Sequence, residues 1–140
     1  MKISNIAETS LYTSDIEAAR RFYGIILGLE EMSYEQNYRV FYKIGNVWLL
    51  IFNPKQTNQI NSFMGNAIPP HGATGSIHLA LNILPSDYSA WEDRLRSHKI
   101  EIELNADWIG QKRSIFFRDT EGNLLELSTG DILTEICRTA

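Results

Sequence analysis

The sequence contains one cysteine, no long apolar run and no excess of basic residues, and each absence excludes a class of protein. Cys137 alone cannot form a disulfide within the chain. The longest apolar run, Val47 to Phe52, is far shorter than the roughly 20 residues that cross a bilayer. The 13 Lys and Arg against 17 Asp and Glu give a net charge of −4, whereas nucleic-acid-binding proteins usually present a basic surface. We therefore expect a cytoplasmic protein with no nucleic-acid partner and no membrane partner, since no apolar leader follows Met1.

Several catalytic motifs are also missing. The sequence contains no G-x-G-x-x-G, P-loop, G-x-S-x-G, H-E-x-x-H or C-x-x-C, which argues against nucleotide binding, serine hydrolysis, zincin chemistry and thiol redox chemistry. What remains is a chain of 140 residues, 44% hydrophobic and 21% charged, which is ordinary for a globular protein. That length predicts one compact domain, or two very small modules that share a core.

Two helices are predicted. Ser14-Asp15-Ile16-Glu17 forms a capping box in which Ser14 caps the helix, and Gly28 ends it. The buried face of this helix is formed by residues at steps of three and four: Ile16, Ala19, Tyr23 and Ile26. The second helix begins at Ser86-Asp87, and its apolar face follows the same spacing: Tyr88, Trp91, Leu95 and His98.

Strands are predicted around both helices, at residues 6–13, 39–44, 46–52, 76–83, 114–118 and 123–128. Gly45-Asn46 is a tight hairpin signal between two of them. Residues 54–74 hold three of the four prolines and are interpreted as a linker or long loop. We therefore expect a single domain over 1–140, with module one at about 4–53, a linker at 54–74, module two at about 75–130 and a C-terminal tail at 131–140.

An internal repeat links the two modules. Residues 6–11 match 76–81 at an offset of 70, and residues 45–50 match 122–127 at an offset of 77. Strand, helix and a meander of strands therefore occur twice. The predicted fold is α+β, with two tandem β-α-β-β-β modules that form a curved mixed sheet.

The repeat places metal-capable side chains at equivalent positions. Glu8 corresponds to His78, and Leu49 corresponds to Glu126. Two carboxylates and an imidazole among apolar neighbours are costly to bury unpaired, and a divalent cation compensates them. Each of the three taken singly is more typical of a solvent-exposed or structural side chain, but their equivalent positions favour a shared metal site.

Two segments resemble the vicinal oxygen chelate superfamily, which includes glyoxalase I, extradiol dioxygenases, fosfomycin-resistance thiol transferases and bleomycin-resistance proteins. Residues 10–29, SLYTSDIEAARRFYGIILGL, resemble its first module. Residues 114–127, SIFFRDTEGNLLEL, resemble its last hairpin. The resemblance covers nearly the whole chain and implies the glyoxalase/dioxygenase-like fold.

The resemblance also implies functional positions. Metal ligands in the superfamily lie on the first and last strand of each module, which assigns Glu8, His78 and Glu126 as ligands of a divalent ion (Zn, Ni, Co, Mn or Fe) and leaves Leu49 without a ligating group. Glu8 and Glu126 are the candidate catalytic carboxylates. Short members of the superfamily commonly place their sites across a homodimer, and we expect a homodimer here.

Four further residues are candidates for binding a small-molecule substrate: Arg39, Phe52, Trp108 and Arg113. Arginine can hold a carboxylate or phosphonate through two hydrogen bonds. His71, in Pro69-Pro70-His71-Gly72, is either a general base near the pocket or an inert loop residue.

Three hypotheses follow for the function. The first is a metal-dependent, glyoxalase-like lyase or isomerase whose substrate chelates the metal through neighbouring oxygens. The second uses the same ligands for extradiol dioxygenase chemistry or fosfomycin-type thiol transfer. The third is a metal-free protein of the bleomycin-resistance type that binds a drug-like ligand.

Overall fold

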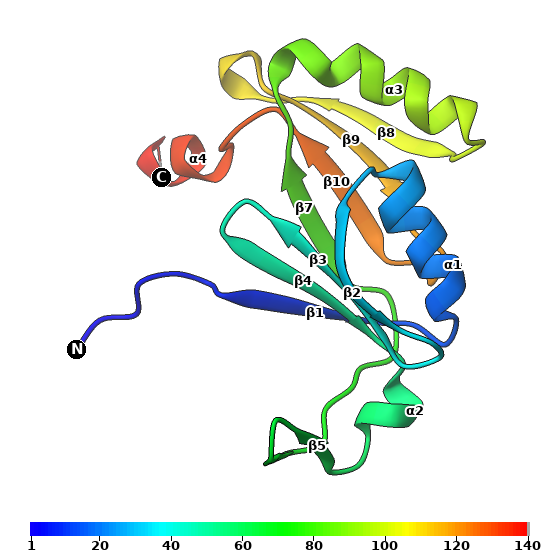
Figure 1. The fold of residues 1–140 in the computed structure, drawn as a ribbon. Coiled ribbons are helices and arrows are strands. Elements are labelled where there is room, and N and C mark those ends of the chain that lie inside the picture. The colour runs from blue at the N-terminus through cyan, green and yellow to red at the C-terminus, as the bar shows by residue number, and fades with distance from the viewer. Residues whose placement is uncertain (140) are drawn as a thin grey trace. The chain divides into compact units, whose positions relative to one another are not determined.

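The computed structural model describes residues 1–139, and the chain divides into two compact units (Figure 1). Unit 1 is Met1–Thr74, and unit 2 begins at Gly75. Each unit contains a four-stranded mixed sheet and helices, so the predicted α+β class with tandem β-α-β-β-β modules is confirmed.

Unit 1 has its sheet in the order β1-β4-β3-β2, with β1 parallel to β4 and the other neighbours antiparallel. Its elements in chain order are β1 (Glu8–Tyr12), α1 (Ile16–Arg20), the π-helix η1 (Arg21–Ile26), β2 (Glu30–Glu35), β3 (Arg39–Ile44), β4 (Val47–Phe52), α2 (Pro54–Thr57), β5 (Asn61–Phe63) and β6 (Asn66–Ile68).

Unit 2 repeats this topology, with its sheet in the order β7-β10-β9-β8 and β7 parallel to β10. Its elements are β7 (His78–Asn82), the 3₁₀ helix η2 (Pro85–Asp87), α3 (Tyr88–Ser97), β8 (Ile102–Asp107), the short turn η3 (Ile109–Gln111), β9 (Arg113–Arg118), β10 (Leu124–Ser128) and α4 (Leu133–Thr139). Among the described residues, no helix combines the length and apolarity needed to cross a membrane.

One face of each sheet is packed against helix. In unit 1 the alternating side chains of β3 and β4 that face α1 and η1 are almost fully buried: Val40, Tyr42, Leu49 and Ile51. The rings of Tyr23 and Tyr42 lie 6.3 Å apart in this layer. In unit 2, α3 buries Tyr88 and Leu95 beside alternating residues of β9 and β10. The opposite face of each sheet is therefore free to carry polar and functional side chains.

The first helix begins one residue later than predicted. Its N-cap is Asp15 rather than Ser14, because the Asp15 carboxylate accepts a hydrogen bond of 2.9 Å from the Ala18 N–H. After Arg20 the helix widens into the π-helix η1, and Gly28 follows its end with a φ of 68°, as the sequence predicts.

Regular structure also occurs where the sequence indicated none. Residues 54–74 hold α2, which Asn53 caps, and the β5–β6 hairpin, whose turn at Met64-Gly65 has positive φ values of 49° and 80°. The predicted C-terminal tail contains α4, whose first turn is held by a hydrogen bond of 2.9 Å from the Thr134 N–H to Asp131.

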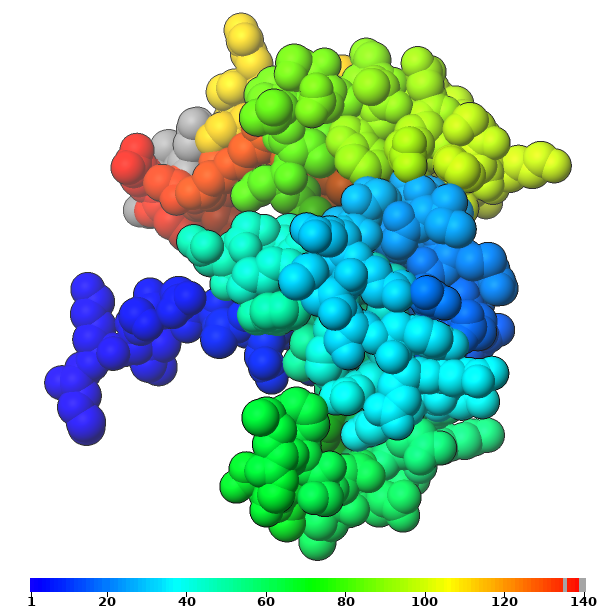
Figure 2. All heavy atoms as spheres, viewed as in Figure 1, coloured from blue at the N-terminus to red at the C-terminus, as the bar shows by residue number. Residues whose placement is uncertain are grey.

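At the N-terminus, residues before β1 are drawn in dark blue in Figure 2 and extend away from the rest of unit 1. Ile3 is 90% exposed and Ile6 is 70% exposed, so neither contributes to the core of unit 1. Ordered pairing begins where the Trp48 N–H donates to the Ala7 carbonyl at 3.0 Å.

Candidate metal and substrate sites

His78 and Glu126 meet on the open face of the unit 2 sheet. β7 and β10 are parallel, with His78 opposite Leu124, so Glu126 lies two residues further along the same face. The distance from His78 Nε2 to Glu126 Oε2 is 3.2 Å. Residue Glu126 is 8% exposed, whereas the His78 side chain is 48% exposed. The pair thus combines an anchored carboxylate with an accessible imidazole.

Both ring nitrogens of His78 face oxygen acceptors. Nδ1 lies 3.0 Å from the Leu124 carbonyl oxygen, and Nε2 faces Glu126 Oε2. A neutral imidazole carries one N–H and can donate to only one of these oxygens. When Nδ1–H donates to the carbonyl, the Nε2 lone pair and the Glu126 carboxylate together can hold a divalent cation. This donor set therefore fits a divalent metal, with the ring oriented by a backbone carbonyl.

Ser114 holds the carboxylate of Glu126 in place. The Ser114 hydroxyl is fully buried and donates to Glu126 Oε1 at 2.5 Å. It also accepts from the indole N–H of Trp108 at 2.9 Å. Sequence reasoning selected Trp108 but missed Ser114. The available signal was strand alternation, which puts the hydroxyl of Ser114 on the face shared by Phe116 and Glu126.

The third predicted ligand, Glu8, belongs to unit 1. Within the described part of the chain, no group of three His, Cys, Asp or Glu side chains gathers into a metal site, so His78 and Glu126 form a two-residue set in unit 2. The three-ligand set of Glu8, His78 and Glu126 stays a prediction.

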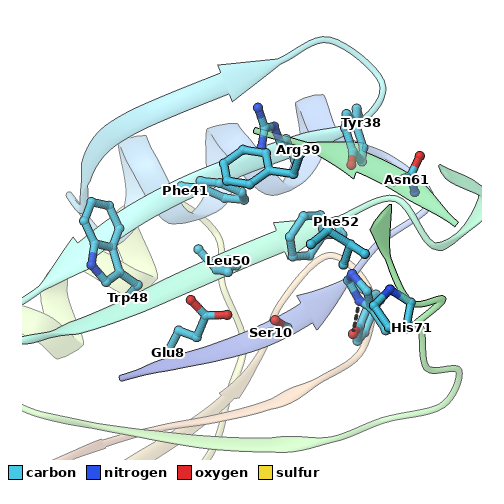
Figure 3. A pocket seen from close by; sticks show the side chains of 14 residues that line it. Glu8, Ser10, Tyr38, Arg39, Phe41, Trp48, Leu50, Phe52, Asn61 and His71 are labelled. Atoms are coloured by element: carbon cyan, nitrogen blue, oxygen red, sulfur yellow. Dashed lines mark hydrogen bonds between the residues drawn. The ribbon is translucent and has the colours of Figure 1, made fainter. Parts of the chain in front are cut away.

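Glu8 lines a pocket of about 620 Å³ on the open face of the unit 1 sheet (Figure 3). Figure 3 shows Glu8 and Trp48 toward one end of this pocket and His71 at the other. The walls are mainly aromatic and come from β1, β3, β4 and the segment that holds β5 and β6: Tyr12, Tyr38, Phe41, Trp48, Phe52 and Phe63. Two predicted substrate-binding residues, Arg39 and Phe52, line the same pocket as Glu8.

Tyr12 and His71 form a polar pair in this pocket. The Tyr12 hydroxyl lies 2.8 Å from His71 Nδ1, and the His71 ring packs edge-on against Phe52 with centroids 5.0 Å apart. Partial burial raises the pKa of the Tyr12 hydroxyl, which keeps it a hydrogen-bond donor. The hydroxyl can therefore donate to Nδ1, and His71 lines the pocket.

Arg113 lies on the other side of the unit 2 sheet from Glu126. On β9, Phe116 is paired with Glu126, and side chains alternate between the two faces of a strand. Arg113 is three residues from Phe116, so its side chain points to the opposite face, which carries α3. Its guanidinium stacks 3.8 Å from the centroid of Tyr88 and pairs with Asp107 at 3.1 Å. The structure thus does not bring Arg113 together with His78 and Glu126.

The strand register corrects the repeat by one residue. Glu8 pairs with Trp48, and His78 pairs with Leu124, so the counterpart of Glu126 is Leu50 and not Leu49. Leu49 faces the helices and is 1% exposed, while Leu50 lines the pocket. The shift arises because the β9–β10 turn is longer than the Gly45-Asn46 turn, which an alignment of Gly-Asn pairs overlooks. The position still carries no ligating group.

Comparison with known proteins identifies relatives over nearly the whole chain. The model of the family described as the Glyoxalase/Bleomycin resistance protein/Dioxygenase superfamily matches residues 5–127. The metallothiol transferase FosB of Staphylococcus haemolyticus is 28% identical over 132 residues, which cover 93% of this chain and 86% of that protein. FosB of Staphylococcus epidermidis is also 28% identical over 132 residues, which cover 93% of this chain and 86% of that protein.

Solved structures share the fold. Lactoylglutathione lyase from Agrobacterium tumefaciens has a TM-score of 0.80 and is 32% identical, covering 91% of this chain and 94% of that one. A variant of the fosfomycin resistance protein FosX from Listeria monocytogenes, complexed with Mn(II) and 1S,2S-dihydroxypropylphosphonic acid, has a TM-score of 0.72. The match covers 99% of this chain and 100% of that one. Because the two sequences are only 20% identical, this similarity shows the fold alone.

Proposed function

This chain belongs to the Glyoxalase/Bleomycin resistance protein/Dioxygenase superfamily, and we propose that it is a divalent-metal-dependent enzyme of the glyoxalase type. Its substrate is a small molecule that chelates the metal through two neighbouring oxygens. The observation that carries the proposal is the approach of His78 Nε2 to Glu126 Oε2 at 3.2 Å, which places two metal-ligating atoms side by side on one face of the sheet. The metallothiol transferase relatives support a divalent metal.

The proposed ligands are His78, Glu126 and Glu8. A bound divalent ion would supply Lewis acidity to the substrate oxygens. Ser114 fixes Glu126 Oε1, and the Leu124 carbonyl fixes the His78 ring, so both side chains are oriented before a substrate arrives.

Glu8 is the better candidate for the base. Both oxygens of Glu126 are already engaged, by Ser114 and by His78. The Glu8 carboxylate is exposed in the pocket of unit 1, where one of its oxygens can take a proton from the carbon beside a substrate carbonyl. A lyase or isomerase reaction needs that proton to be removed and returned at the neighbouring carbon.

Metal analysis after dialysis tests the ligand set. Wild type is expected to retain a divalent metal, whereas His78→Ala and Glu126→Ala lose it with unchanged circular dichroism. His98→Ala, at the exposed end of α3, removes an imidazole elsewhere and is expected to retain the metal. Equal and weak metal binding by wild type and by the two ligand variants would refute the site.

Thiol transfer is the second candidate, because curated FosB proteins match 93% of the chain. Loss of fosfomycin that depends on an added thiol identifies this reaction, and isomerisation of the adduct of glutathione and an α-oxoaldehyde identifies the first. Oxygen consumption with Fe²⁺ and a catechol would instead indicate a dioxygenase. A ligand that raises the melting temperature in excess chelator, without turnover, would indicate a binding protein.

The functional form proposed here is a homodimer in which each site is completed by module one of one chain and module two of the other. The size of the protein in solution, measured by light scattering, tests the dimer, and a monomeric mass would contradict it.

A further inference from the structure

The pocket of unit 1 has two polar ends and a mainly apolar middle. Because β1, β4 and β3 pair in register, the side chains on the pocket face form rows across the sheet. Glu8 is in the first row, and Arg39 is in the third row with Tyr12 and Phe52. Four residues along a strand at the ~3.3 Å rise per residue place these rows roughly 13 Å apart. Ser10, Leu50 and Phe41 occupy the row between them, so this row is apolar except for one hydroxyl.

Arg39 is surrounded by rings. Its Cζ atom lies 4.9 Å from the centroid of Phe41 and 5.3 Å from the centroids of both Tyr38 and Phe63. The guanidinium therefore contacts β3 and the β5–β6 hairpin together, and Figure 3 shows it beside Phe41 and Tyr38. Contacts of this kind hold a guanidinium in place. Its N–H groups, which lie in the plane of the guanidinium, stay available for hydrogen bonds.

The charge of Arg39 is incompletely compensated within unit 1. Its Nε atom is buried and makes no hydrogen bond. The Glu35 carboxylate approaches Nε to 3.3 Å, yet the Glu35 side chain is 55% exposed against 19% for Arg39. A solvated carboxylate at the rim neutralises a buried guanidinium poorly, and a ligand carboxylate inside the pocket would pair with it in a drier environment. Arg39 is the only Lys or Arg among the residues that line the pocket.

We propose that this pocket binds a molecule with a flat aromatic body and a carboxylate, the carboxylate paired with Arg39 and the body stacked on the rings between Arg39 and Glu8. A volume of about 620 Å³ suits a drug-sized ligand, whereas a three-carbon substrate at Glu8 would leave the second and third rows uncovered. In the metal-free protein the negative charge of Glu8 repels the carboxylate and so favours its binding at Arg39. The inference rests on the proposed function, because the end of the ligand away from Arg39 is the end that reacts near Glu8.

Calorimetric titration with two matched probes in EDTA tests this proposal independently of any metal. Naphthalene-2-carboxylate carries the anion, and naphthalene-2-carboxamide is its neutral isostere. Wild type is expected to bind the carboxylate at least tenfold more tightly than the carboxamide. Arg39→Gln is expected to abolish this preference, and Glu35→Gln to strengthen carboxylate binding several-fold. Arg96→Gln, which removes an exposed cation from α3, is expected to behave as wild type.

Equal affinity of wild type for the two probes, or an unchanged preference in Arg39→Gln, would overturn the proposal. If Arg39→Gln does not fold, the wild-type preference and its increase in Glu35→Gln decide the question. Failure of the proposed function appears separately, as absence of metal binding that depends on His78 and Glu126 in the dialysis experiment.

Discussion

Ser114 connects two side chains that the sequence separates by 18 positions, Trp108 and Glu126. Ser114→Ala removes a buried hydroxyl that donates to one and accepts from the other. We expect a loss of about 1–3 kcal/mol in the free energy of unfolding, because the indole N–H and the carboxylate each lose a partner. We also expect metal affinity to fall about 10–100-fold, because the carboxylate loses the contact that orients it.

Urea unfolding and competition with a metal indicator measure these two effects. Ser62→Ala, at an exposed position on β5, is the matched control and is expected to change neither. A Ser114→Ala variant with wild-type metal affinity would show that Ser114 does not position Glu126.

Tyr42 gives unit 1 a defined response to alkaline pH. Its ring is fully buried, and burial raises the pKa of its hydroxyl well above the ordinary value of 10.0, with a smaller contribution from the negative charge of Glu31. Above pH 10 the unfolded chain releases this proton while the folded chain keeps it, so the free energy of unfolding falls as pH rises. Below that pH the contribution is fully present.

Between pH 8 and pH 11 the free energy of unfolding is expected to fall in both proteins. The fall is expected to be about 1.4 kcal/mol smaller in Tyr42→Phe than in wild type. Chemical unfolding at a series of pH values measures this, and the comparison at pH 7 and pH 8 is the control because neither state ionises there. Burial also raises the pKa of Tyr12 and Tyr88, so part of the alkaline loss persists in the variant. Identical pH profiles for the two proteins would contradict the prediction.

Among the elements, the start of α1 depends on one carboxylate. Asp15 caps the helix through the Ala18 N–H and places a negative charge at the positive end of the helix dipole. Asp15→Ala is expected to destabilise the protein by about 1 kcal/mol in urea unfolding. Asp93→Ala, which removes an exposed carboxylate from α3, is expected to stay within about 0.5 kcal/mol of wild type. Equal effects of the two substitutions would show that the Asp15 carboxylate is not the cap.

Besides the β5–β6 hairpin, two strands received no predicted range, and each is an edge strand of its four-stranded sheet. β2 reads Glu-Glu-Met-Ser-Tyr-Glu and β8 reads Ile-Glu-Leu-Asn-Ala-Asp, and most of their side chains are exposed. Each pairs with its sheet through backbone hydrogen bonds to a single neighbour and contains a register shift. β2 carries little apolar alternation, so a pattern of side chains cannot reveal it. β8 alternates Ile, Leu and Ala with Glu, Asn and Asp, so its signal was present in the sequence and was missed.

At the scale of the whole molecule, the proposed homodimer predicts complementation between inactive chains. Glu8→Ala leaves His78 and Glu126 intact, and His78→Ala leaves Glu8 intact. If one site takes module one from one chain and module two from the other, a mixed dimer contains one complete site. Random mixing then restores about a quarter of the wild-type metal sites.

Unfolding and refolding an equal mixture of the two variants, followed by metal analysis, measures this recovery. Each variant refolded alone is the control and is expected to bind no metal at high affinity. Absence of recovery in the mixture would place all ligands of a site within one chain or exclude Glu8 from the ligand set.

What the sequence determined by itself is the repeated module and its candidate ligands, because alternation, helical spacing and the Gly-Asn turns are local patterns. They place Glu8, His78 and Glu126 on strands and predict two β-α-β-β-β units. Only the tertiary structure decided which side chains share a face of a sheet and which residues distant in the sequence are in contact. Strand register moved the counterpart of Glu126 from Leu49 to Leu50, because a shift of one residue reverses the face. Long-range pairing brought Ser114 to Glu126 and His71 to Tyr12, contacts between positions whose spacing follows no local period.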